Sequence, residues 1–156
     1  MFSKFTASLV AVAIALVHVN AETHTVTFTN DCGGSGYPIL RAQDGTILST
    51  GGAYTIDGPL IGAIAYLQTG GCGDNGEYCT LIETTLENGA SSTDISLIPP
   101  HEFSVTSGFG YYDGCDGAGA DCTYADCPTA FHSSGQTGVQ VACTADNENL
   151  AITFCD

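Results

Sequence analysis

Thr23 to Cys32, T-H-T-V-T-F-T-N-D-C, is the stretch of sequence that decides the fold. Within it, the apolar side chains of Val26 and Phe28 alternate with threonines, which is the two-residue period of a strand with one buried face. The stretch runs straight into Cys32, the first of eight cysteines. We therefore predict that the folded chain opens with a half-buried β-strand.

The rest of the chain is typical of many short strands joined by tight turns. No window sustains a 3.6-residue apolar period, and 20 glycines, together with many Ser and Thr, interrupt the apolar runs. Asp44-Gly45 and Asn88-Gly89 are turn signals, because glycine readily adopts positive φ angles. Further strands are expected at residues 39–42, 46–49, 53–56, 61–68, 81–86, 94–97, 103–107, 139–142 and 150–154. This pattern predicts an all-β sandwich.

Residues 113–128 are expected to form a loop. The segment, D-G-C-D-G-A-G-A-D-C-T-Y-A-D-C-P, holds three cysteines and four aspartates but no aliphatic residue larger than alanine. Because it has little apolar surface to bury, we expect cross-links to hold it in place. Carboxylates can bind Ca²⁺, but their spacing here differs from that of a calcium loop, so no metal site is predicted. The carboxylates in question are Asp113, Asp116, Asp121 and Asp126.

The N-terminus has the shape of a secretory signal peptide. The apolar run from Ala7 to Val19 is shorter than the roughly 20 residues that a membrane-spanning helix requires. It ends in the small-residue boundary Val19-Asn20-Ala21, so we predict cleavage after Ala21. A retained membrane anchor is the alternative. Removal of residues 1–21 leaves residues 22–156, a length that predicts one secreted domain.

The predicted mature chain is strongly acidic. Once Lys4 is removed with the leader, Arg41 is the only Lys or Arg, against 17 Asp and Glu. Such a surface repels nucleic acid and anionic membranes, so neither is an expected partner. It suits a neutral or cationic ligand, or it serves only to keep a monomer in solution.

The eight cysteines are expected to form four disulfides. Thiols pair and persist in the oxidising compartment that a secreted chain enters. Zinc is the alternative, since Cys122 and Cys127 have a spacing that a metal site can use. Zinc ligands, however, need reduced thiolates and usually come in repeated short pairs, which this chain lacks. Spacing alone leaves 105 ways to pair the eight residues.

Several stretches resemble thaumatin-like proteins. They are T-V-T-F-T-N-D-C (25–32), G-G-A-Y-T-I-D-G-P (51–59), T-D-I-S-L (93–97), C-P-T-A-F (127–131), V-A-C (141–143) and I-T-F-C (152–155). The long cysteine-rich segment of larger members is missing, so the chain resembles a small, truncated type. T-G-G-C (69–72), S-L-I-P-P-H (96–101) and the acidic segment also resemble secreted "glycopeptide" proteins of basidiomycete fungi.

The resemblance implies a thaumatin-like antiparallel β-sandwich and one disulfide pairing. The implied bonds are Cys32–Cys155, Cys72–Cys79, Cys115–Cys143 and Cys122–Cys127. The first would join the opening strand to the closing one. In the chain-entropy model, a bond that closes so long a loop stabilises the fold by about 4 to 5 kcal/mol.

The resemblance also implies an acidic cleft, which in this family is lined by one Arg, one Glu and three Asp. Some members bind or weakly hydrolyse β-1,3-glucans there. Glu83, in T-L-I-E-T-T-L, and Asp94, in D-I-S-L, match two of the five positions. Tyr66 to Thr69 replace the region of the Arg, Pro99-Pro100 replace the second Asp, and Thr129 replaces the third. Glu83 and Asp94 are therefore the candidate catalytic residues, and the alternative is that both are solvated strand residues.

Aromatic rings are the other candidate ligand contacts, because sugars stack on exposed aromatic faces. Tyr111 and Tyr112 lie in a glycine-rich stretch beside the acidic segment, and Tyr66 is a further candidate. Core packing is the alternative for such residues. The three histidines after the leader are far apart and are expected at the surface rather than as metal ligands: His24, His101 and His132. No cofactor is predicted.

Three functions remain open at this point. The leading hypothesis is a non-enzymatic secreted protein that binds extracellular or cell-wall β-glucan, or another neutral polysaccharide, through an acidic surface with tyrosines. The second is a weak endo-β-1,3-glucanase that uses Glu83 and Asp94 as its acid and its nucleophile or base. The third is a structural or effector-like protein with a protein partner. The leading hypothesis rests on fold analogy, and fold does not determine function.

Overall fold

The computed structural model describes residues 21–156. The predicted signal peptide lies outside this range apart from its last residue, Ala21. Within the described range, no helix is long and apolar enough to cross a membrane.

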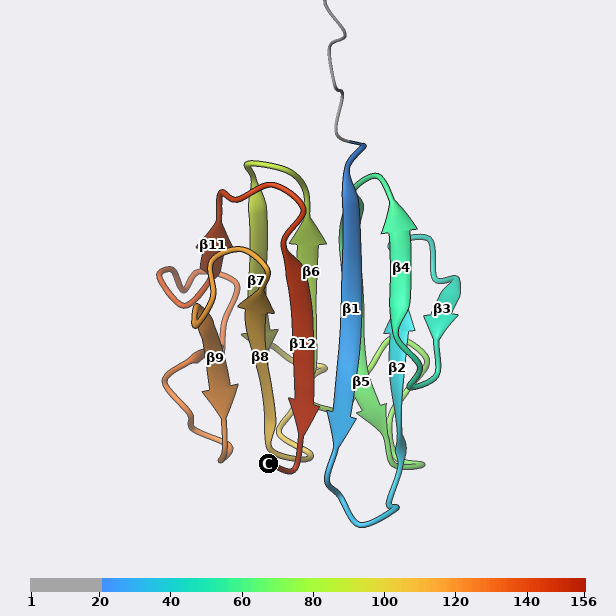
Figure 1. Ribbon diagram of the computed structural model, residues 1–156. Coiled ribbons are helices and arrows are strands. Elements are labelled where there is room, and N and C mark those ends of the chain that lie inside the picture. The colour runs from blue at the N-terminus through green and yellow to red at the C-terminus, as the bar shows by residue number, and fades with distance from the viewer. Residues whose placement is uncertain (1–20) are drawn as a thin grey trace, which may run out of the picture.

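The described chain folds into two β-sheets that pack face to face (Figure 1). Sheet A has the strand order β4-β1-β12-β8-β9, and sheet B has the order β10-β7-β6-β5-β2-β3, with β11 also paired to β7. The strands are β1 (Thr23–Asn30), β2 (Tyr37–Arg41), β3 (Ile47–Ser49), β4 (Tyr54–Asp57), β5 (Leu60–Gln68), β6 (Leu81–Leu86), β7 (Ser91–Ser96), β8 (Ser107–Tyr112), β9 (Gly119–Cys122), β10 (Ala130–Phe131), β11 (Val141–Cys143) and β12 (Asn149–Phe154). The predicted all-β sandwich is confirmed.

The opening stretch forms β1, an inner strand of sheet A between β4 and β12. Val26 is buried in the core, as its alternation with threonine predicts. β1 pairs with β12 in parallel, with Val26 opposite Leu150 and Phe28 opposite Ile152, and Figure 1 shows these two strands side by side. The first and last strands of the chain therefore lie next to each other. This pair and β7–β10 are parallel, which the prediction of an antiparallel sandwich did not include.

The core lies between the two sheets. Sheet A contributes alternate residues of β1, β8 and β12, and sheet B contributes those of β2, β5, β6 and β7. Fully buried side chains of this layer include Val26, Leu40, Ile82, Leu86, Ile95, Leu150, Ile152 and Phe154. Because these residues recur at every second position, each strand turns its intervening side chains away from the core.

All four disulfides implied by the family resemblance are present. Cys32–Cys155 spans a sequence separation of 123 and joins the ends of β1 and β12. Cys115–Cys143 and Cys122–Cys127 fasten the acidic segment, and Cys72–Cys79 closes a short loop after β5. Within residues 21–156 no cysteine is free. Bonds of this kind fit an extracellular protein.

The strand predicted at residues 103–107 is wrong, because the strand in this region is β8, at residues 107–112. Its glycines lower its apparent strand propensity, but they permit a close approach to β9. At Gly119, which lies opposite Gly110, a Cβ atom would come within 2.1 Å of the Phe109 carbonyl oxygen. Part of the segment predicted as an acidic loop is therefore a strand, and alternation along β8 turns Phe109 and Tyr111 into the core.

Candidate ligand-binding site

The outer face of sheet B carries the two carboxylates that the family resemblance singles out. In β6, Ile82, Thr84 and Leu86 are buried while Glu83 is exposed. In β7, Ile95 belongs to the core, so the adjacent Asp94 faces the other way. The two-residue period of each strand thus places both carboxylates on the same face.

Glu83 and Asp94 are direct cross-strand partners in the antiparallel β6–β7 pair. The next pair along the ladder, Thr84 and Thr93, lies on the core side, where the two hydroxyl oxygens are 2.7 Å apart. Tyr111, which belongs to sheet A, donates a hydrogen bond from its hydroxyl to the Thr93 hydroxyl at 2.9 Å. These buried contacts hold the register that brings the two carboxylates together.

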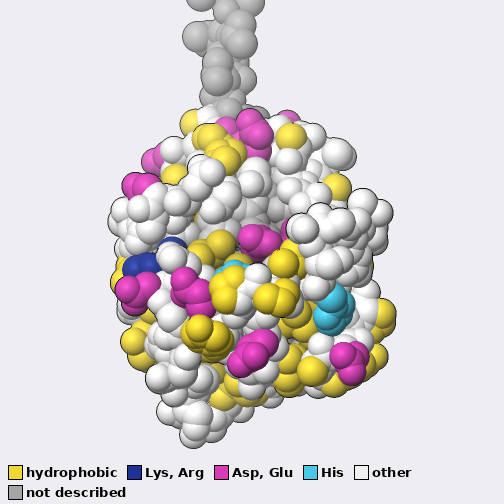
Figure 2. Space-filling model, turned by 180° about the vertical axis from the view of Figure 1, so that it is seen from behind, with side chains coloured by type: hydrophobic (Ala, Val, Ile, Leu, Met, Phe, Trp, Pro, Cys, Tyr) yellow, Lys and Arg dark blue, Asp and Glu magenta, His cyan; other side chains and the backbone are white. Residues whose placement is uncertain are grey.

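The carboxylate pair lies in a recess of about 120 Å³ on this face. Figure 2 shows this side of the molecule hollowed near its middle, with acidic side chains in the hollow and apolar side chains gathered below it. The recess is lined by Gly62, Ala63, Ile64, Glu83, Thr84, Thr85, Ser92, Asp94 and Gln140. Most of this lining is polar and small, so the recess offers hydrogen-bonding groups rather than an apolar pocket.

Asp94 is the unusual group of the recess, because it is a carboxylate with only 6% of its surface exposed. Its Oδ2 accepts a hydrogen bond from Gln140 Nε2 at 3.1 Å, whereas its Oδ1 has no partner. Burial, and after it the charge of Glu83, raises the pKa of Asp94 to about 6, against a smaller opposing effect of the Gln140 hydrogen bond. Near that pH the Asp94 carboxyl group exchanges a proton with solvent.

No cation neutralises this pair within the described residues. Arg41, the only Lys or Arg among residues 21–156, pairs with Ile64 of β5, and Ile64 in turn lies opposite Glu83. The guanidinium nevertheless turns toward the loop after β5, where its Nη1 donates to the Asp74 carbonyl oxygen and, at 3.3 Å, to Asn75 Oδ1. The family's cleft arginine is thus not replaced by Arg41.

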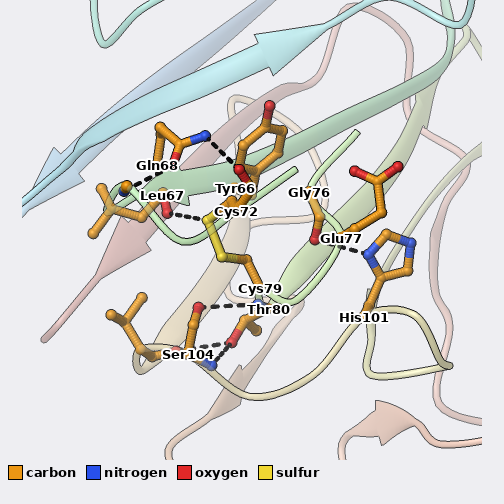
Figure 3. The surroundings of a disulfide bond; sticks show 12 residues. Tyr66, Leu67, Gln68, Cys72, Gly76, Glu77, Cys79, Thr80, His101 and Ser104 are labelled. Atoms are coloured by element: carbon orange, nitrogen blue, oxygen red, sulfur yellow. Dashed lines mark hydrogen bonds between the residues drawn. A yellow bond between two sulfur atoms is a disulfide. The ribbon is translucent and has the colours of Figure 1, made fainter. Parts of the chain in front are cut away.

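Of the expected ligand residues, the structure brings only Glu83 and Asp94 together. Tyr66 is 2% exposed; it packs against Ile39 and Leu81, and its hydroxyl donates to the Asp74 carbonyl oxygen at 2.8 Å. Figure 3 shows its ring beside the disulfide-closed loop that covers it.

The other two expected tyrosines belong to sheet A. Tyr111 lies in the core, with its hydroxyl bonded to Thr93 and to the Val141 carbonyl oxygen. Tyr112 is half-buried on the outer side of that sheet, away from the recess. The expected row of tyrosines beside the two carboxylates is therefore not formed. Tyr78 and Tyr124, which are 61% and 54% exposed, are the tyrosines that present their rings to solvent most fully.

A second pocket is apolar, and β7 leads toward it. It is lined by Tyr78, Leu97, Pro99, Pro100, His101, Glu102, Phe103, Ala125 and His132. Its two histidines are held by backbone carbonyls: His101 Nδ1 lies 2.9 Å from the Gly76 oxygen, and His132 Nε2 lies 2.8 Å from the Cys127 oxygen. β7, which carries Asp94 of the recess, ends at Ser96, and the next residue, Leu97, lines this second pocket.

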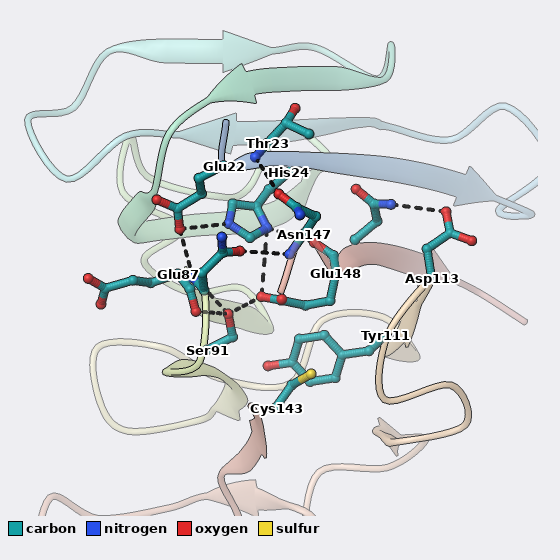
Figure 4. Close-up of polar contacts among 12 residues, drawn as sticks. Glu22, Thr23, His24, Glu87, Ser91, Tyr111, Asp113, Cys143, Asn147 and Glu148 are labelled. Atoms are coloured by element: carbon teal, nitrogen blue, oxygen red, sulfur yellow. Dashed lines mark hydrogen bonds and ion pairs between the residues drawn. The ribbon is translucent and has the colours of Figure 1, made fainter. Parts of the chain in front are cut away.

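His24 corrects the expectation that all three histidines lie at the surface. It is 1% exposed and sits between two carboxylates, as Figure 4 shows. Its Nδ1 is 2.7 Å from the Glu148 carbonyl oxygen and 3.7 Å from Glu148 Oε1, and its Nε2 is 3.1 Å from Glu22 Oε1. The alternation along β1 would have revealed this burial, since residues 24 and 26 share a face.

The Glu148 side chain is fully buried and accepts a hydrogen bond from the Ser91 hydroxyl. Ser91 therefore donates to a glutamate rather than to the histidine, which is not the arrangement of an activated nucleophile. Its oxygen also accepts from the Glu87 amide at 2.7 Å. In residues 21–156, no group of three or more His, Cys, Asp or Glu is arranged to hold a metal ion.

Comparison with known proteins shows the fold. The solved structure of the thaumatin-like xylanase inhibitor TLXI is similar, with a TM-score of 0.57 and 20% sequence identity over 85% of this chain and 99% of that chain. The similarity thus extends over nearly the whole of that neighbour. No protein-family model and no curated protein matches the sequence.

Proposed function

We propose that this protein, which has the thaumatin-like fold in a short form, is secreted and binds extracellular or cell-wall β-glucan as a non-enzymatic monomer. The observation that carries the proposal is the open recess on sheet B with the Glu83–Asp94 pair at its centre. Carboxylates and amides are strong acceptors and donors for the hydroxyls of a sugar ring. Gln140, Thr85 and Ser92 add further hydrogen-bonding groups around the pair.

The presence of a second, apolar pocket next to the end of β7 supports binding of an extended chain rather than a single small ligand. Sugar hydroxyls would meet the polar recess, while ring faces would lie on apolar side chains of this second pocket. Tyr78 and Phe103, in the second pocket, supply aromatic surface of the kind on which sugar rings pack. These residues replace Tyr66, Tyr111 and Tyr112 in the proposed binding surface.

A second candidate function, weak endo-β-1,3-glucan hydrolysis, is favoured by one observation. The pKa of Asp94, at about 6, suits a proton donor in mildly acidic surroundings, and Glu83 is the neighbouring carboxylate. Against it, the two side chains rise from adjacent strands of one sheet face, whereas a glycosidase places its carboxyl groups on either side of the scissile bond. Binding without cleavage is the better match to this geometry.

The test incubates residues 22–156 with insoluble β-1,3-glucan and measures both loss of protein from solution and release of reducing ends. We expect depletion without release. Glu83→Gln should reduce depletion, whereas the matched control Glu87→Gln, which removes the same charge from an exposed residue after β6, should not. Release that disappears in Glu83→Gln would favour the hydrolase.

Absence of both depletion and release would contradict the glucan proposal. It would instead favour a protein partner. Because the neighbour TLXI is a xylanase inhibitor, a glycoside hydrolase is the first such partner to test.

A further inference from the structure

We infer that the Glu83–Asp94 recess is a subsite for an ammonium group carried by a sugar, so that glucosamine-containing polymers are bound in preference to uncharged ones. The inference rests on the proposed function, in that the outer face of sheet B is taken as a carbohydrate surface. Beyond that function, we infer that the preferred sugar carries a positive charge.

The first argument is the missing counter-charge. The row of residues across sheet B contains both carboxylates and the only arginine of the described chain, but the Arg41 guanidinium bonds to Asp74 and Asn75 instead. Two carboxylates side by side, one of them buried, repel each other unless a cation or a proton joins them. An uncharged sugar supplies neither.

The second argument is the unpartnered oxygen. Asp94 is more than nine-tenths buried and lines the recess, yet its Oδ1 accepts no hydrogen bond. Buried polar atoms are nearly always satisfied, so this oxygen marks a place for a donor. An ammonium group has three donors and no acceptor. It therefore fits a site lined by the carboxyl groups of Asp94 and Glu83 and by the hydroxyls of Thr85 and Ser92.

The third argument concerns what carries the ammonium group. A lysine side chain of a partner protein would bring a long apolar stem, which is best accommodated by an apolar channel. Ala63 and Ile64 are the main apolar residues of the recess, and its other walls are glycine, hydroxyl, amide and carboxylate groups. Such walls match an amino sugar, because the amino group on its ring lies beside hydroxyl groups rather than at the end of an apolar stem.

The charge state of the recess sets a pH dependence. β5 contributes no titratable side chain to the lining, and the segment at residues 139–140 contributes the neutral Gln140. Arg41 of β2 bonds to the loop after β5 instead. Glu83 and Asp94 are therefore the ionisable groups that face the ligand. As pH rises through the Asp94 pKa of about 6, the recess gains its second negative charge. Affinity for the ammonium form of the sugar should rise there and fall again when the amine loses its proton.

The test compares three trisaccharides of the same length by NMR titration or calorimetry near pH 6: β-linked glucosamine, its N-acetylated form and β-1,3-linked glucose. Acetylation keeps the ring but removes the charge. We expect glucosamine to bind at least about tenfold more tightly than its acetylated form, with the preference lost in Glu83→Gln and Asp94→Asn. Glu87→Gln should keep it, and urea unfolding checks that each variant is folded.

Other outcomes overturn either the inference or the function beneath it. Equal affinity for the charged and acetylated sugars would contradict the ammonium subsite while leaving glucan binding intact. A preference that survives in Glu83→Gln and Asp94→Asn would assign it to the acidic surface in general and would also contradict the subsite. Selective glucosamine binding without any glucan binding would support the subsite and contradict the proposed β-glucan ligand. Tighter binding of a trilysine peptide than of the glucosamine trisaccharide would contradict the inference, because the ammonium group would then belong to a partner protein rather than to a sugar.

Discussion

Two pairs of carboxylates in residues 21–156 differ in what lies between them. Glu22 and Glu148 enclose His24 near the start of β1 and bond to protein groups, although Glu148 Oε2 has no partner. Glu83 and Asp94 face an open recess, and no Lys or Arg of these residues bonds to them. The pair that encloses His24 therefore stabilises the fold, whereas the Glu83–Asp94 pair is available to a ligand.

The histidine cluster joins segments that are distant in sequence. Glu22 Oε1 accepts from the Asn88 amide at 2.7 Å, in the turn between β6 and β7, while Glu148 precedes β12. Both nitrogens of His24 lie within hydrogen-bonding distance of oxygen atoms, the Glu148 carbonyl oxygen and Glu22 Oε1. The cluster therefore fastens the first residues of β1 to both sheets.

The largest effect is expected from breaking the enclosed pair. His24→Ala removes a fully buried ring and leaves the buried Glu148 without its histidine, so the free energy of unfolding should fall by about 2 to 5 kcal/mol, as when other large buried side chains are truncated to alanine. Urea denaturation measures this. His101→Ala, which removes a half-buried ring bonded to one carbonyl, is the control and should cost about 1 kcal/mol or less. Equal losses in the two variants would remove the distinction.

The open pair should respond in the opposite direction. Asp94→Asn removes a buried charge that Glu83 repels, and its side-chain oxygen can still accept from Gln140. We expect the variant to be more stable than the native protein by about 1 to 2 kcal/mol at neutral pH, a range reduced for partial solvent screening. The urea midpoint measures the change. A destabilised Asp94→Asn would mean that this carboxylate supports the fold.

The stability difference between Asp94→Asn and the native protein should depend on pH, and its sign follows from the Asp94 pKa. The folded-state pKa of Asp94 lies above its ordinary value of 3.8, so folding favours the protonated form. Its contribution to stability is therefore fully present below about pH 4 and is lost as pH rises to about 6. The stability gained by Asp94→Asn should grow over this interval and stay constant above it. A difference that does not change with pH would contradict the assigned pKa.

The smallest effect on stability is expected at Glu83, whose side chain is exposed. Glu83→Gln should change the free energy of unfolding by no more than about 0.5 kcal/mol, as is usual for surface positions. Its ligand binding should nevertheless fall markedly in the glucan depletion assay. Loss of stability in parallel with loss of binding would identify Glu83 as a structural residue.

The sequence could predict the parts of this molecule that depend on local pattern. Alternation in β1 predicts its buried face, and the family resemblance implies both the disulfides and the Glu83–Asp94 pair. β8 lies later in the chain than predicted because its glycines look unfavourable for a strand. The close approach of β9 requires glycine at Gly119, where a Cβ atom would meet the Phe109 carbonyl oxygen. Local pattern shows that alternate residues share a face, but not which face is covered.

The same limit explains why Tyr66 and Tyr111, which were expected to contact a ligand, are buried. Tyr66 lies on the outer face of sheet B, as a ligand contact would, but the loop closed by Cys72–Cys79 covers it, with Gly76 against its ring. Tyr111 faces the core because the other sheet lies there. Both outcomes depend on contacts between segments that are distant in sequence.

The central claim is that Glu83 and Asp94 form an uncompensated pair, and the pH titration of the Asp94 carboxyl carbon by NMR tests it most directly. The account predicts a pKa of about 6 in the native protein. It also predicts a lower pKa in Glu83→Gln and in the presence of the glucosamine trisaccharide. A pKa near the ordinary 3.8 in the native protein, unchanged by either, would contradict the claim.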